Sequence, residues 1–135
     1  MGSTDKPMEE ILLALQERAK ELSCLYRVDE ILVRHETNPE DAYREMLGAI
    51  PGGWQYPKVC QARLVVDGRV YQPADWREAP WSMQADIVLE GEKIGHLSVS
   101  YTDRCPPADE GPFLKEERRL INAVVERIGY SVMQR

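Results

Sequence analysis

Two histidines and three cysteines are the side chains of this chain best suited to catalysis or metal binding. His35 and His96 have no Asp, Ser or Cys nearby at a motif spacing, and we interpret both as structural or solvent-facing. Cys24, Cys60 and Cys105 are odd in number and far apart, which is typical neither of a disulfide framework nor of a zinc site. The sequence therefore predicts no enzyme activity and no metal, identifies no cofactor, and suits a reducing cytoplasm.

The glycine-rich stretch at residues 51–53 (PGG) is the segment closest to a phosphate-binding loop. No Lys followed by Ser or Thr comes after it, and no helix is predicted to start there, so the Walker-type mechanism is missing. We interpret this stretch as the end of a helix.

The composition limits the classes of partner. The chain has 135 residues, of which 43% are hydrophobic and 30% charged, with a net charge of −6. This is the length of one soluble domain. Nucleic acids and anionic membranes attract clustered positive charge, which this acidic chain lacks. No apolar run approaches the length that spans a bilayer. We therefore expect no nucleic-acid partner and no membrane insertion.

Aromatic residues near the predicted sheet form a candidate ligand pocket. Ligand pockets are mainly apolar and contain a few polar groups. The candidate lining is Trp54, Tyr56, Arg63, Tyr71, Trp76, Arg77, Trp81 and Asp86. In the alternative interpretation, the rings fill this space themselves as part of the core. The presence of only one Phe favours the alternative, because these rings must then supply much of the bulky packing.

Two long helices are predicted at the ends of the chain, over residues 8–34 and 112–133, and residues 1–7 are expected to be a disordered leader. In the first helix Leu12, Leu15, Ala19, Leu22 and Tyr26 are spaced by 3, 4, 3 and 4 residues, as in a coiled-coil seam. This helix would span about 40 Å, too long for a small domain alone to cover. A shorter helix should begin at Asn38-Pro39, where Asn is a good N-cap and Pro suits the first turn.

Two β-hairpins are predicted between the helices. Residues 59–66 alternate in polarity and lead through Asp67-Gly68, a type I′ turn signal, to a return strand at 69–72. Residues 83–89 and 97–101 form the second hairpin, with a bulge indicated at Gly95. We expect one α+β domain over residues 8–135, with an antiparallel sheet and both terminal helices packed on one of its faces.

With these elements in place, the chain resembles a GAF-like domain of the GAF/PAS type, as found in bacterial sensor histidine kinases and in phosphoenolpyruvate-synthase-type proteins. The resemblance extends from Leu12 onward. It rests on residues 21–26 (ELSCLY), 54–57 (WQYP), 60–65 (CQARLV), 77–81 (REAPW), 85–87 (ADI) and, most strongly, 109–120 (DEGPFLKEERRL). It implies a sensory or regulatory module whose terminal helices dimerise and pass a signal to an attached or partner domain. It does not supply a ligand.

The expected assembly is a homodimer formed by the terminal helices. Pairing of the first helix with its copy would give a two-fold bundle, for which we expect parallel helices, although the seam does not fix their direction. The candidate interface consists of Leu12, Leu15, Ala19, Leu22, Tyr26, Ile128 and Val132. The alternative function is a stand-alone dimeric scaffold domain that binds other proteins and no small-molecule ligand.

Overall fold

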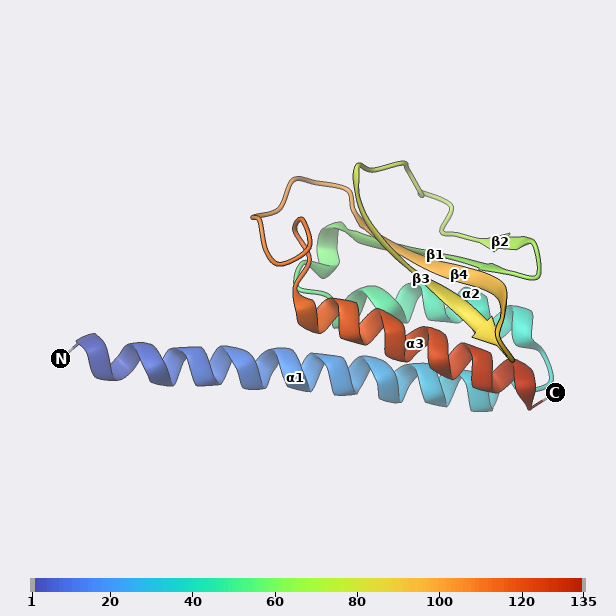
Figure 1. The fold of residues 1–135 in the computed structure, drawn as a ribbon, viewed down its shortest axis with the longest axis horizontal. Helices are drawn as coiled ribbons and strands as arrows, with labels where there is room; N and C mark the ends of the chain where they lie inside the picture. The colour runs from blue at the N-terminus through green and yellow to red at the C-terminus, as the bar shows by residue number, and fades with distance from the viewer. Residues whose placement is uncertain (1, 135) are drawn as a thin grey trace.

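The computed structural model describes the backbone of residues 2–134 and the side chains of residues 7–134. Three α-helices, two 3₁₀ turns and four strands form an α+β fold (Figure 1). In chain order they are α1 (Gly2–Arg34), α2 (Pro39–Ala49), η1 (Ile50–Gly53), η2 (Pro57–Val59), β1 (Cys60–Val66), β2 (Arg69–Tyr71), β3 (Trp81–Leu89), β4 (Glu92–Tyr101) and α3 (Lys115–Met133).

The strands form one antiparallel sheet in the order β2-β1-β4-β3. Both predicted hairpins are confirmed. Their two-residue turns place Asp67-Gly68 and Glu90-Gly91 at positive φ, as a type I′ turn requires. The hairpins are joined through the pairing of β1 with β4, which runs from Cys60 opposite Tyr101 to Val66 opposite Gly95.

A β-bulge lies in β4, as predicted from Gly95. Ile87 pairs with Gly95 and Val88 with Lys93, so Ile94 is the extra residue. A Cβ on Gly95 would lie only 1.9 Å from the Val65 carbonyl oxygen of β1. This position therefore requires glycine, because the two backbones approach too closely for any side chain.

The helices form two layers on one face of the sheet. α3 packs on β3 and β4, while α2 packs on β1 and β2. α1 packs against α2, η1 and α3, on the far side of the helices from the sheet (Figure 1). The expectation that both terminal helices cover the sheet is therefore correct only for α3. α1 forms an outer layer because α2 and α3 already bury the apolar faces of the strands.

Two helix boundaries differ from the prediction. α1 begins at Gly2, so residues 2–7 of the expected leader belong to the helix, and Pro7 lies within it; Met1 is outside the described residues. α3 begins at Lys115 and not at residue 112. Pro112 and Phe113 are buried ahead of the helix, where Phe113 forms an isolated antiparallel bridge with Glu110.

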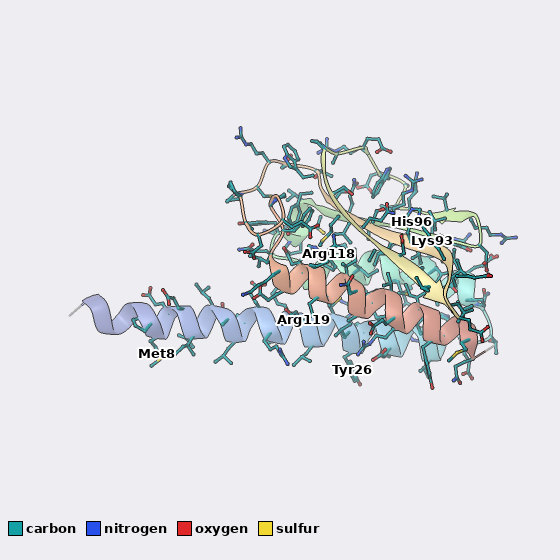
Figure 2. All side chains as sticks on the ribbon, in the orientation of Figure 1. Met8, Tyr26, Lys93, His96, Arg118 and Arg119 are labelled. Carbon is teal, nitrogen blue, oxygen red and sulfur yellow. The ribbon has the colours of Figure 1, made fainter. Side chains whose placement is uncertain are left out.

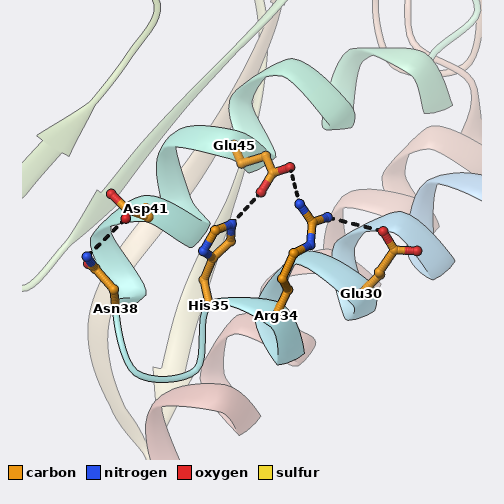
Figure 3. A network of polar contacts seen from close by, with 6 residues as sticks. All are labelled: Glu30, Arg34, His35, Asn38, Asp41 and Glu45. Atoms are coloured by element: carbon orange, nitrogen blue, oxygen red, sulfur yellow. Dashed lines mark hydrogen bonds and ion pairs between the residues drawn. The ribbon is translucent and has the colours of Figure 1, made fainter.

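Polar contacts fix α1 to its neighbours. Arg34 and His35, at the end of α1, bind the carboxylate of Glu45 in α2 at 2.8 and 2.6 Å (Figure 3). The predicted N-cap residue Asn38 precedes α2, but its amide donates to the Asp41 carboxylate and does not cap the helix backbone. These contacts hold α1 and α2 together at their connection.

Two further ion pairs join α1 to α3. Glu21 pairs with Arg119 at 3.3 Å, and Asp29 pairs with Arg127 at 3.1 Å. The two acids are eight residues apart on α1, and the two arginines that pair with them are eight residues apart on α3 in the same order. α1 and α3 therefore run parallel. Figure 1 shows the first half of α1 projecting beyond the body of the domain.

Candidate functional site

The predicted seam of α1 lies on the exposed side of the helix. Leu15 is 60% exposed and Tyr26 is 70% exposed, and Figure 2 shows Met8 and Tyr26 on the side of α1 away from the sheet. The heptad spacing continues to Met8 in one direction and to Val33 in the other, both of them exposed. We call this set the α1 seam: Met8, Leu12, Leu15, Ala19, Leu22, Tyr26 and Val33, with Asp29 as its one polar position.

The opposite face of α1 belongs to the core of the domain. Its buried members are Glu21, Cys24, Val28, Ile31 and Leu32. α1 therefore has two apolar faces, of which the chain itself covers only one. Contiguous apolar side chains left in water mark interaction sites more often than single exposed leucines do.

The two predicted interface residues of α3 do not join this surface. Ile128 is completely buried in the core, so its place in the candidate interface was wrong. Val132 is half-buried. The apolar stripe of α3 faces the sheet and α1, which leaves Tyr130 and Met133 as its exposed apolar residues.

Residues 7–16 of α1 are not covered by any other part of the chain that the structure describes. Every side chain from residue 7 to residue 16 is exposed. Ile11, beside the seam, and Leu13, outside the seam, are further exposed apolar side chains there. We call residues 7–16 the overhang. An isolated helix of this length is marginal in water, because most helical stability in proteins comes from packing an apolar face. The overhang is thus a surface that needs a partner.

A groove of about 780 Å³ lies between the last turns of α1 and α3. Leu32, Val33 and Tyr130 contribute its apolar surface, while Glu36 and Glu126 are among its charged residues. Val33 and Asp29 belong both to the groove and to the α1 seam, so the two surfaces are continuous.

The structure divides the predicted ligand pocket between the two faces of the sheet. Four residues lie in or against the core on the helix side. Trp54 is completely buried, and Trp81 packs against the core from the start of β3. Tyr71 packs edge-on against Tyr43, and Tyr56 packs edge-on against Tyr101. These rings fill space, as the alternative interpretation expected.

The other four residues lie on the outer side of the sheet. The Arg63 guanidinium lies over the Trp76 ring, 5.9 Å from its centre. Arg77 is held by the Gln61 side chain, which accepts from its N–H and donates to its carbonyl oxygen. Asp86 lies two strands away from β1 and pairs with Lys93. The eight residues therefore do not line one pocket.

A different cavity, of about 420 Å³, opens at the edge of β1. β1 has seven residues but β2 pairs only with Leu64–Val66, so the first half of the β1 edge lacks a neighbouring strand. Cys60 and Ala62 line the cavity there, with Lys58 and Arg77 at its charged side. Of the predicted pocket residues it contains only Arg77. The predicted return strand at 69–72, which is shorter than the strand at 59–66, is the sequence signal that could have indicated this opening.

A buried carboxylate joins several of the stretches that carry the family resemblance. Glu117 is 2% exposed, and it accepts hydrogen bonds from the N–H groups of Gln55 and Leu114, each at 2.7 Å, and from the Tyr101 hydroxyl at 3.0 Å. We call these four residues the Glu117 junction. The ring of Tyr101 stacks on Phe113 with centres 4.9 Å apart.

Burial controls the ionisation of the junction. It raises the pKa of Glu117, although the three hydrogen bonds to the carboxylate act in the opposite direction. Burial and the neighbouring Glu117 carboxylate raise the pKa of the Tyr101 hydroxyl well above its usual range. Sequence analysis singled out the motif around Glu117 but did not indicate that this acid is buried.

Burial changes the ionisation of three of the candidate catalytic side chains. Burial raises the pKa of Cys24 to about 11 and also raises that of Cys60, which disfavours a reactive thiolate. His96 lies on the outer face of the sheet, where burial and then Lys93 lower its pKa. Within residues 7–134 no group of three or more His, Cys, Asp or Glu side chains is placed to hold a metal ion.

Among the described helices, none is both long and apolar enough to cross a bilayer. No family model matches the chain, and no curated protein or solved structure is similar enough to match it. The functional proposal therefore depends on the geometry of the chain itself.

Proposed function

We propose that this chain is a GAF-like regulatory module without catalytic activity, which dimerises through α1 and relays a signal to an attached or partner signalling domain. The exposed α1 seam is the observation that carries the proposal. A seam of seven apolar residues at heptad spacing is complementary to a second copy of itself. The acidic composition disfavours nucleic acids and anionic membranes as partners, and so fits a protein that binds other proteins or a small molecule.

A set of contacts connects the interior of the domain to the seam. The Glu117 carboxylate holds Gln55, and the preceding carbonyl oxygen, of Trp54, accepts a hydrogen bond from Lys20 of α1 at 2.7 Å. Lys20 follows Ala19 of the seam directly. A change in the packing of the body that moves η1 or α3 therefore displaces α1, and two packings of α1 in a dimer are the kind of two-state element that a signal can bias.

The test compares two substitutions in the same turn of α1. Leu15 lies in the seam and Leu13 lies outside it, yet both are 60% exposed. We expect Leu15→Glu to raise the Kd of the dimer at least about a hundredfold, because each protomer loses an apolar contact and gains a buried charge. Leu13→Glu should leave the Kd nearly unchanged. Sedimentation velocity over a concentration series measures both.

A monomeric wild-type protein, or equal effects of the two substitutions, would overturn the proposal. Thermal unfolding of both variants provides the control for folding. Both side chains are exposed within their own chain, so neither change should lower the Tm of a monomer by itself.

The scaffold function is the second candidate, and one observation favours it. Trp54 and Tyr71, two predicted pocket residues, are buried as part of the core. Native mass spectrometry of the purified dimer distinguishes the two functions. A reproducible extra mass that is lost on unfolding supports the sensor, whereas a bare dimer, unchanged on incubation with a metabolite mixture, supports the scaffold.

A further inference from the structure

The overhang and the groove between α1 and α3 are two exposed apolar surfaces at opposite ends of α1. Asp29 of the groove is 18 residues from Ile11 of the overhang, which is about 27 Å along the helix. The overhang therefore cannot reach the groove of its own chain. It reaches the groove of a second copy if the two α1 helices run in opposite directions.

We infer that two copies of this chain pair through α1 in antiparallel orientation, so that the overhang of each covers the groove of the other. This inference rests on the proposed function, since it requires the α1 dimer, and it replaces the parallel pairing that the seam alone led us to expect. The occupant of the groove is thus residues 7–16 of a second copy.

Parallel pairing in register places each seam residue against its own copy. The two Ala19 methyl groups would then leave a void, and the two Tyr26 rings would compete for one layer. The two Asp29 carboxylates, each paired with Arg127 of its own chain, would also face each other in one layer of the seam, which would then have no apolar contact. Three of the eight positions from Met8 to Val33 are therefore unfavourable in the parallel form.

Antiparallel pairing that uses the whole seam brings small residues against large ones. In this register the facing positions add up to 41. Ala19 meets the partner's Leu22, Leu15 meets the partner's Tyr26, and Met8 meets the partner's Val33. Leu12 meets the partner's Asp29, whose carboxylate is already paired with Arg127 of its own chain. No carboxylate of the seam then faces its copy.

The same register explains the apolar side chain beside the seam in the overhang. Ile11 lies one position before Leu12 and is 54% exposed. In the antiparallel form it flanks the seam on the same side as the partner's Leu32, which lines the groove and lies two residues, or about 3 Å along the helix, beyond the position level with Ile11. In the parallel form Ile11 lies opposite the partner's Gln16, and the groove stays open in both chains.

Photo-crosslinking measures the orientation directly. p-Benzoylphenylalanine in place of Ile11 is irradiated in a mixture of unlabelled and ¹⁵N-labelled protein, and the crosslinked peptides are identified by mass spectrometry. We expect crosslinks between chains that join position 11 to residues 29–36 and 126–134. Crosslinks to residues 8–18 of the other chain would overturn the antiparallel arrangement while leaving the dimer intact. If the protein is found to be monomeric, the proposed function is overturned as well.

Two charged substitutions give an independent readout. Glu36 and Glu126 lie at the groove, while Asp29 there is neutralised by Arg127. In the antiparallel form Ile11→Glu should therefore weaken the dimer about tenfold more than Ile11→Lys does. Equal Kd values for the two variants contradict the inference, because a neutral partner residue such as Gln16 does not distinguish the sign of the charge.

Discussion

The Glu117 junction and the α1 seam contrast in two respects, namely how distinctive their sequences are and how exposed their side chains are. Three of the four junction residues come from the most distinctive stretches of the chain, yet the Glu117 and Tyr101 side chains are buried, and the Glu117 carboxylate accepts hydrogen bonds from the other three residues. The seam consists mostly of leucines and other ordinary helix residues, yet it is exposed and has no partner within the described part of the chain. Distinctive motifs here organise the fold, and the surface available for function is the plainest part of the sequence.

The largest effect should come from removing the buried carboxylate. Glu117→Ala leaves two partly buried N–H groups and the buried Tyr101 hydroxyl without their acceptor, so we expect a loss of about 3 kcal/mol in the free energy of unfolding. Urea denaturation followed by circular dichroism measures it. Glu116→Ala, on the same turn of α3, is the control and should change stability much less. If Glu117→Ala instead keeps full stability and changes only dimer affinity, the contrast between the two regions fails.

A smaller effect should come from the place where the two regions meet. A Cβ on Gly53 would lie 2.7 Å from a methyl group of Leu120 in α3 and 2.9 Å from the thiol sulfur of Cys24 in α1. Gly53→Ala should therefore cost about 1–3 kcal/mol by overpacking and should also shift the dimer Kd, because α1 is displaced.

Gly52 provides the matched control for this overpacking. A Cβ there meets no atom within 4 Å, so Gly52→Ala should stabilise the protein by about 0.5 kcal/mol or leave it unchanged. Denaturation curves and sedimentation of both variants are needed. A Gly53→Ala protein that is destabilised but dimerises normally would show that the interior and the seam are not coupled.

The smallest effect concerns two carboxylates that should titrate in opposite directions. Burial raises the pKa of Glu117 above its ordinary value of 4.5, whereas hydrogen bonds from Arg34 and His35 lower the pKa of the exposed Glu45. The pH-dependent part of the contribution of Glu117 to stability is therefore fully present below pH 4.5 and is lost as the pH rises through its folded-state pKa. The contribution of Glu45 is present above pH 4.5 and is lost as the pH falls through its folded-state pKa.

Carboxyl ¹³C NMR titration checks both directions, with Glu117→Gln and Glu45→Gln providing the assignments. If the pKa of Glu117 is below 4.5, its three hydrogen bonds outweigh burial, and the folded protein then favours the ionised form of this carboxylate.

Local sequence patterns were sufficient to predict most of the fold. Alternation of polarity and the Asp67-Gly68 turn predicted the first hairpin, because both signals involve residues that are close in sequence. Heptad spacing likewise predicted a long first helix. The position of α1 in an outer layer could not be predicted, because α2 carries an apolar stripe of its own and competes for the same sheet.

The candidate pocket was the least predictable feature. Trp54 and Trp76 both lie in connections, and nothing in their local sequence indicates that one enters the core while the other covers the outer face. The side of the sheet on which a loop residue lies depends on contacts with strands distant in the sequence. The polarity of an aromatic ring does not indicate which side of the sheet it covers, because such a ring packs well both in the core and on the outer face.

The sequence by itself determined the types of the elements, the turns, the bulge at Gly95 and the heptad spacing of α1, since each depends on backbone preferences and periodicity over a few residues. Only the tertiary structure decided which of the two apolar faces of α1 is buried. It also decided that Glu117 is buried and that Ile128 belongs to the core. The physical reason is that burial depends on which surfaces the other elements have already covered, and that competition is settled only when the whole chain packs.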